Sequence, residues 1–229
     1  GRLTLVEAAV ESLEGALAAG RSGADRIELC VNLDAGGTTP SAALIAAVAH
    51  DMRIPVFVLI RPRTGDFVYK RREIDAMTRD IELAVGMGIA GIVTGALNPD
   101  TTVNVQQTRT LGNAAAGLPV TFHRALDSAA NLSEALERVI DAGASRVLTS
   151  GGAPTAEDGA DAIAALVDQA GGRISVVAGG GIREHNVRDV IARTGADEVH
   201  SRLVDEARMR NLIDVVRTTG ESGRGGLHR

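Results

Sequence analysis

Short apolar runs rich in β-branched residues alternate along the chain with stretches that show helical periodicity. The clearest run is Val-Phe-Val-Leu-Ile at 56–60, and an uninterrupted apolar segment of this length is typical of a strand buried on both faces. Comparable runs begin near Leu3, Arg26, Pro55, Ala90, Pro119, Arg146, Arg173 and Asp197. The pattern therefore predicts eight strands, each followed by a helix.

Two of the intervening stretches carry one apolar stripe at helical spacing. The first comprises Ile74, Met77, Ile81, Ala84 and Val85, and the second comprises Leu132, Ala135, Leu136, Val139 and Ile140. Helix ends are marked as well: Thr155 with Asp158 resembles a capping box, and left-handed C-terminal caps are expected at Gly20, Gly88, Gly143 and Gly195. Each predicted helix therefore packs one face against a sheet.

The alternation of strands and helices predicts an α/β fold with a parallel sheet, since the crossovers between parallel strands are right-handed. Eight such units in a chain of 229 residues close most economically into a single-domain (β/α)8 TIM barrel, which we assign to residues 1–217. An open doubly wound sheet is the alternative, but residues 6–15 lack the G-x-G-x-x-G turn of a dinucleotide site. Residues 218–229, rich in Gly and Arg, are predicted to form a flexible tail.

Composition excludes several classes of function. The formal net charge is -5, and no basic face with interleaved aromatic residues is visible, so a nucleic acid is not an expected partner. Cys30 is the single cysteine and cannot form an internal disulfide, and no apolar stretch approaches the roughly 18 to 20 residues of a membrane span. We expect a protein of a reducing compartment, without membrane contact.

Ionisable groups stand at the positions that should face the barrel interior. Because side chains alternate along a strand, Ile27 and Leu29 on the helix side turn Glu28 and Cys30 inward. The same parity pairs Leu5 with Glu7, Leu59 with Arg61, Thr121 with His123, and Glu198 with His200. Two interpretations stay open for this ring: an internal ion-pair network of Glu7, Glu28 and Arg61, or carboxyl groups used in acid–base catalysis.

The candidate catalytic residues are acids and a histidine at strand ends: Glu7, Glu28, Asp66, His123 and Asp127. Carboxyl groups in a concave site can transfer protons, and a histidine can do so near neutral pH. For the fifth unit the alternative is structural, with Asp127 capping the next helix and His123 hydrogen-bonded in the core.

The candidate substrate-binding residues are suited to an anion: Arg61, Arg63, Arg124, Ser150, Gly151, Gly179, Gly180 and His200. Arginine binds carboxylate or phosphate through two donors, and bare glycine backbone lets N–H groups converge on an anion. Tight turns are an equally good explanation of the glycines. Phe67 and Tyr69 are expected either to cover the mouth of the barrel or to anchor a long loop.

Six segments, in their order along the chain, resemble the CutC copper homeostasis proteins. They are Arg26-Ile27-Glu28-Leu29-Cys30, Gly36-Gly37-Thr38-Thr39-Pro40-Ser41, Ile60-Arg61-Pro62-Arg63-Thr64-Gly65-Asp66-Phe67, Val120-Thr121-Phe122-His123-Arg124-Ala125-Leu126-Asp127, Leu148-Thr149-Ser150-Gly151-Gly152 and Glu198-Val199-His200-Ser201. The resemblance covers nearly the whole chain. It implies a cytoplasmic barrel, a link to copper and a homodimer.

The chain departs from the family in its first strand. Many members resemble one another in reading Glu-Ile-Cys there, whereas Glu7 is followed here by Ala8 and Ala9. Cuprous ion prefers thiolate and thioether ligands, so a candidate ligand is missing. Cys30 remains the candidate metal ligand, with His123 or His200 able to complete a site, and its alternative is a small buried hydrophobic residue.

Two functions of different class stay open. The resemblance implies a copper-handling protein whose partner is the copper ion. The residues favour a metal-independent isomerase or lyase that transfers protons beside a carbonyl of a small anionic substrate.

Overall fold

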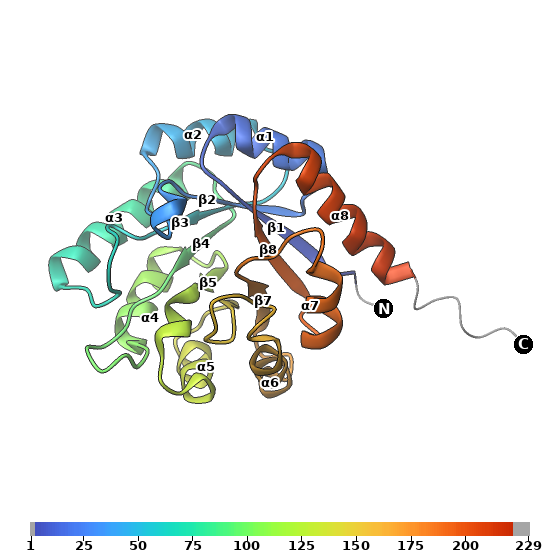
Figure 1. Cartoon of the computed structure of the whole chain (residues 1–229). Helices are drawn as coiled ribbons and strands as arrows, with labels where there is room; N and C mark the ends of the chain where they lie inside the picture. Colours follow the sequence, from blue (N-terminus) through green and yellow to red (C-terminus); the bar gives the residue numbers. More distant parts are fainter. Residues whose placement is uncertain (1–2, 222–229) are drawn as a thin grey trace, which may run out of the picture.

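Eight parallel strands close into a barrel surrounded by helices in the computed structural model, which describes residues 3–221 (Figure 1). The strands are β1 Leu5–Val10, β2 Arg26–Leu29, β3 Val56–Leu59, β4 Gly91–Thr94, β5 Val120–Phe122, β6 Arg146–Thr149, β7 Ser175–Gly179 and β8 Glu198–Arg202. The α-helices are α1 Leu13–Ser22, α2 Ala42–Asp51, α3 Arg71–Gly86, α4 Val105–Ala114, α5 Leu132–Asp141, α6 Ala160–Ala170, α7 Val187–Thr194 and α8 Glu206–Glu221. Two 3-10 helices, η1 Leu33–Ala35 and η2 Arg124–Ser128, follow β2 and β5.

The barrel closes through the pairing of the first and last strands. Neighbouring strands pair in sequence order, and β1 also pairs with β8, so Glu7 has Arg26 on one side and His200 on the other. Helices α1 and α8 lie side by side over this seam (Figure 1). The predicted (β/α)8 barrel is confirmed, and every strand begins within two residues of its predicted start.

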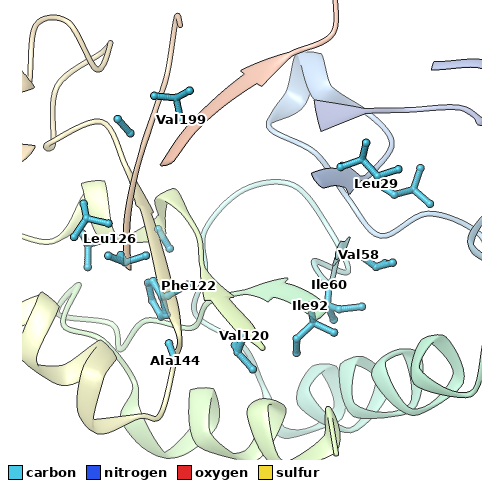
Figure 2. Close-up of a cluster of buried hydrophobic side chains, with 14 of the residues drawn as sticks. Leu29, Val58, Ile60, Ile92, Val120, Phe122, Leu126, Ala144 and Val199 are labelled. Carbon is cyan, nitrogen blue, oxygen red and sulfur yellow. The ribbon is translucent and has the colours of Figure 1, made fainter. Parts of the chain in front are cut away.

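The apolar core lies mainly between the strands and the helices. Ile27, Leu29 and Val58 face outward into this layer, and Figure 2 shows Leu29 and Val58 there with Ile92, Val120 and Phe122. The predicted stripe of α3 is buried against the same layer through Ile74, Met77, Ile81 and Ala84. Inside the barrel a smaller cluster contains Cys30, Phe57, Leu59 and Val93, as the alternation of side chains predicted.

Helix ends agree with the sequence at most positions. Gly195 caps α7 in the left-handed conformation, and Gly88 and Gly143 follow α3 and α5 with positive φ. The prediction for Gly20 was wrong, because α1 continues through it and Gly23, at φ 91°, forms the cap.

The predicted capping box of α6 was also wrong. Thr155 and Asp158 do bond to one another, with the Thr155 hydroxyl donating to the Asp158 carboxylate at 2.8 Å and accepting from its N–H at 3.1 Å. They form a turn before the helix, however, and α6 begins at Ala160 after the N-cap Gly159.

The last helix is longer than predicted. Residues 218–221 belong to α8 although their composition predicted a flexible tail. The rest of that predicted tail, residues 222–229, lies outside the described residues. Among residues 3–221 we find no helix with both the length and the apolarity that spanning a membrane requires.

Candidate functional site

A cavity of about 400 Å³ opens where the strands end and the loops that follow them begin. Its strand residues include Ala9, Glu28, Leu59, Leu148 and His200. Ser201 and Arg202 at the end of β8 also line it. The loops and 3-10 helices that follow the strands contribute Leu33, Ala35, Gly36, Arg61, Phe67, His123, Arg124, Ala125, Gly180, Gly181, Ile182 and Arg183. The cavity therefore brings together four ionisable side chains, as their inward parity predicted: Glu28, Arg61, His123 and His200.

Below this cavity a network of ion pairs crosses the barrel interior. Arg26 donates from Nε to Glu7 and from Nη2 to Glu198, both at 2.5 Å, and Arg146 reaches Glu198 at 3.1 Å. The predicted internal network exists, but its cations are Arg26 and Arg146, which the sequence reasoning missed. Arg26 carried a usable signal, since it stands two residues before Glu28 and so shares its inward parity.

Glu7, His200 and Glu28 connect this network to the cavity. Nδ1 of His200 lies 2.6 Å from Oε1 of Glu7 and 3.6 Å from Oε2 of Glu28. Burial alone would raise the pKa of Glu7, but His200 and Arg26 outweigh burial and lower it to about 2. Burial opposes the charged form of His200, and the Glu28 and Glu7 carboxyl groups overcome that effect and raise its pKa.

Glu28 is the acid of the cavity whose protonation changes near neutral pH. Burial raises its pKa to about 7, against the opposing attraction of His200. The residue is 5% exposed, and Oε2 has no hydrogen-bond partner within the described part of the chain. Glu28 can therefore both accept and release a proton at physiological pH.

His123 is held as a neutral donor. The N–H of Ala125 donates to Nδ1 at 3.1 Å, so the ring proton of the neutral form is on Nε2. Burial, with the nearby charge of Arg61, lowers the pKa of His123 to about 3. Nε2 is buried without a partner among residues 3–221, and the Phe67 ring packs 5.0 Å from the imidazole. One nitrogen therefore caps η2 and the other is available as a donor. A pKa of about 3 does not suit the proton transfer near neutral pH that the sequence suggested for His123.

Arg61 does not join the ion-pair network, so that part of the network prediction was wrong. Its Nη atoms donate to the carbonyl groups of Ala35 at 3.3 Å, Gly37 at 3.0 Å and Gly65 at 2.9 Å. The guanidinium thereby ties the loops after β2 and β3 together. It is 6% exposed, has no acidic partner among the described residues, and leaves Nε unpaired.

Three predicted residues of the β3–α3 loop lie outside the cavity. Arg63 pairs with Glu73 at 2.5 Å and Asp66 at 3.1 Å, and the Asp66 side chain is 69% exposed. Tyr69 is buried in the outer core, so it anchors the loop, whereas Phe67 lines the cavity. Sequence proximity to Arg61 was misleading because Arg63 pairs with Glu73 of α3 and Asp66 instead of entering the cavity.

Asp127 organises the loop after β6. Its carboxylate accepts from the Thr149 hydroxyl at 2.5 Å and from the N–H groups of Ser150 at 3.0 Å and Gly152 at 3.1 Å. Arg124 also donates to it from Nε, at 2.8 Å. The donors expected to bind an external anion here are therefore occupied by an internal carboxylate, and Ser150 is not part of the cavity wall.

The glycines of the two predicted anion loops differ in role. Gly151 needs its small size for a close turn, because an added Cβ would lie 2.4 Å from the carbonyl oxygen of Gly159. Gly179 lies behind the cavity wall, where a Cβ would meet Leu148 and His200. Gly180 lines the cavity. Two further arginines of the wall, Arg183 and Arg202, were missed, although Arg202 shares the inward parity of His200.

Cys30 is fully buried beside Phe57 and Leu59. Burial strongly raises the pKa of its thiol, and Sγ lies 3.6 Å from the carbonyl oxygen of Val10. Within residues 3–221 the cluster with metal-ligand geometry is Glu7, Glu28 and His200, whose ligand atoms lie within 4.8 Å of one another. Cys30 is therefore outside the best donor cluster.

Comparison with known proteins gives consistent matches. The sequence profile of the CutC family matches residues 4–204. A CutC family protein of Xanthomonas axonopodis pv. citri is 49% identical over 86% of this chain and 82% of its own, and one from Caulobacter vibrioides is 46% identical over 86% and 80%.

Solved structures resemble the fold. A CutC protein from Streptococcus agalactiae, named provisionally as a copper homeostasis protein, superposes with a TM-score of 0.82 at 32% identity over 86% of this chain and 98% of its own. Thiamine phosphate pyrophosphorylase from Pyrococcus furiosus, at 17% identity over 95% of this chain and 96% of its own, superposes with a TM-score of 0.66 and shares the barrel alone. On the strength of the profile and of these relatives, the chain belongs to the CutC family.

Proposed function

We propose that this protein is an enzyme that transfers a proton beside a carbonyl group of a small anionic substrate. The observation that supports this is a set of three unpaired polar atoms in side chains that line one cavity: Oε2 of Glu28, Nε of Arg61 and Nε2 of His123. Each residue is more than nine-tenths buried, and each comes from a different strand end. Leaving buried polar atoms without partners costs about 1–3 kcal/mol each, so their coincidence points to a ligand that satisfies them.

The three groups differ in the way that this chemistry needs. Glu28, with a pKa of about 7, accepts the proton from carbon and returns it. Neutral His123 donates from Nε2, and Arg61 supplies a fixed positive charge, so both can stabilise an oxygen that becomes negative during the transfer. His200 and Glu7 lie behind Glu28 and hold its pKa in the working range.

Proton exchange in D₂O tests this proposal whichever product the reaction gives. A panel of 2-oxoacids, hydroxyketones and their phosphate esters would be incubated with the protein and followed by proton NMR. We expect exchange of a carbon-bound proton in one class, reduced at least 100-fold in Glu28→Gln. Asp66→Asn is the matched control, since it removes an acid outside the cavity. Exchange that is absent throughout the panel, or equal in wild type and Glu28→Gln, contradicts the proposal.

We propose copper binding in the cytoplasm as the second candidate, because the CutC protein from Streptococcus agalactiae is named provisionally for copper homeostasis and one donor cluster here favours it. The oxygen and imidazole donors of Glu7, Glu28 and His200 suit cupric rather than cuprous ion. Cys30 would first have to lose a proton that burial holds in place.

Titration of the purified protein with each copper ion tests this candidate. Stoichiometric cupric binding that is lost in His200→Gln supports the donor cluster, and anaerobic cuprous binding that is lost in Cys30→Ser supports the thiol. Equal binding by wild type and both variants contradicts copper binding at these groups. The homodimer that the resemblance implies stays a prediction, and light scattering of the same sample tests it.

A further inference from the structure

The loop after β7 carries two backbone N–H groups, those of Gly181 and Ile182, that have no acceptor in the described part of the chain. Gly180, Gly181 and Ile182 line the cavity. Their carbonyl groups bond elsewhere: Gly180 accepts from the N–H of Ala156 at 2.9 Å, and Gly181 accepts from Nδ2 of Asn186 at 2.9 Å. In a trans peptide the N–H points opposite to the C=O, so the N–H groups of Gly181 and Ile182 point away from these partners.

The loop after β6 shows what such a set of donors binds. There the N–H groups of Ser150 and Gly152 converge on the carboxylate of Asp127. In the described residues the N–H groups of Gly181 and Ile182 have no corresponding acceptor. The two loops adjoin, since a Cβ at Gly180 would lie 3.2 Å from the Cβ of Ser150. One anion position is therefore filled from within, and the residues of its neighbour line the cavity.

The arginines around the second position add charge. Arg183 donates from Nη1 to the carbonyl of Ile182 at 2.6 Å and lies 3.3 Å from the Ser201 hydroxyl, but it makes no ion pair among residues 3–221. Arg124 is fixed through Nε and Nη2, and its Nη1 lies 3.3 Å from the position of a Cβ on Gly180. Arg202 is neutralised by Asp34 at 2.6 Å, so the uncompensated cation among these described residues is Arg183.

We propose that the β7–α7 loop, defined as residues 180–183, together with Arg124 forms a subsite for a phosphate group of the substrate. Backbone N–H groups and guanidinium groups approaching from several directions suit a tetrahedral dianion better than a planar carboxylate. The inference rests on the proposed function, because the phosphate end is bound at the mouth while Glu28, His123 and Arg61 act on the carbonyl end. The substrate class is then a small phosphorylated carbonyl compound.

Binding of inorganic phosphate, measured by calorimetry at constant ionic strength, tests the subsite. We expect wild type to bind phosphate at least ten-fold more tightly than formate. Arg183→Gln should weaken phosphate binding at least ten-fold. Arg183→Lys keeps the charge but loses the paired N–H donors of the guanidinium, so its affinity for phosphate should lie between those of wild type and Arg183→Gln. Arg193→Gln is the control, since Arg193 is an exposed arginine of α7 paired with Asp189 and Asp161.

The outcomes separate this inference from the proposed function. Glu28→Gln should abolish proton exchange and leave phosphate binding unchanged, so a catalytic failure does not remove the subsite. The subsite is overturned if phosphate does not bind at about 10 mM, roughly ten times the concentration that half-fills a millimolar site, or if it binds equally to wild type and Arg183→Gln. Phosphate bound no better than formate overturns the preference for a dianion. Circular dichroism of each variant verifies that the barrel is folded.

Discussion

Replacing Glu28 by Gln should make the protein lose less stability as the pH rises. Burial raises the pKa of Glu28 from the ordinary 4.5 to about 7, so the folded protein holds a proton that the unfolded chain releases. The stability that this retained proton provides is complete below pH 4.5 and is lost as the pH rises through 7. Gln stays neutral in both states and does not lose it.

The magnitude follows from the displacement of the pKa. One pH unit of displacement is worth ~1.4 kcal/mol, so the full effect is about 3 kcal/mol. Between about pH 5 and pH 8 the free energy of unfolding of Glu28→Gln should therefore rise by roughly 2 to 3 kcal/mol relative to wild type. Glu28 also raises the pKa of His200, so the variant loses less of the stability that His200 gives up as the pH rises, and this acts in the same direction.

Urea unfolding of both proteins at pH 5, 6, 7 and 8 gives the measurement. Glu82→Gln, which changes an exposed glutamate of α3, is the matched control and should differ from wild type equally at every pH. A difference between Glu28→Gln and wild type that stays constant from pH 5 to pH 8 would refute the reasoning, because Glu28 would then ionise alike in the folded and unfolded states.

Three further predictions concern other parts of the site. Glu7→Gln should destabilise the protein by about 3–5 kcal/mol at pH 7, since Arg26 and His200 lose a partner. Because the pKa of Glu7 is lowered, the loss of stability measured by urea unfolding should shrink as the pH falls from 4.5 towards 2. A loss of stability that does not shrink speaks against the pairing. Asp127→Asn should speed hydrogen exchange at the N–H groups of Ser150 and Gly152 at least ten-fold while strand β3 is unaffected; unchanged exchange would mean that the carboxylate does not hold the loop. Cys30 should react with a thiol reagent only after denaturation, because its side chain is fully buried; rapid reaction of the native protein would contradict that burial.

The barrel itself could be predicted from local patterns. Uninterrupted apolar runs and single apolar stripes are short-range signals, and eight repeats of the pair allow few arrangements other than a closed parallel sheet. Alternation along a strand then placed Glu28, Arg61, His123 and His200 inside, because the period of a strand does not depend on the rest of the chain. The errors at Gly20 and Thr155 concern helix ends, where neighbouring turns compete for the same residues.

The partners of each charged group were decided only by the tertiary structure. Parity shows that Glu7 and Arg26 point inward, but the register between β1, β2 and β8 brings Arg26 to Glu7 and Glu198 and leaves Arg61 to bind carbonyl groups. Likewise, two similar glycine loops follow β6 and β7, and Asp127 occupies the first while Arg183 stands uncompensated beside the second. Residue types and strand period are properties of the sequence, whereas the pKa of Glu28 and the position left for an anion arise from burial and contacts between distant segments.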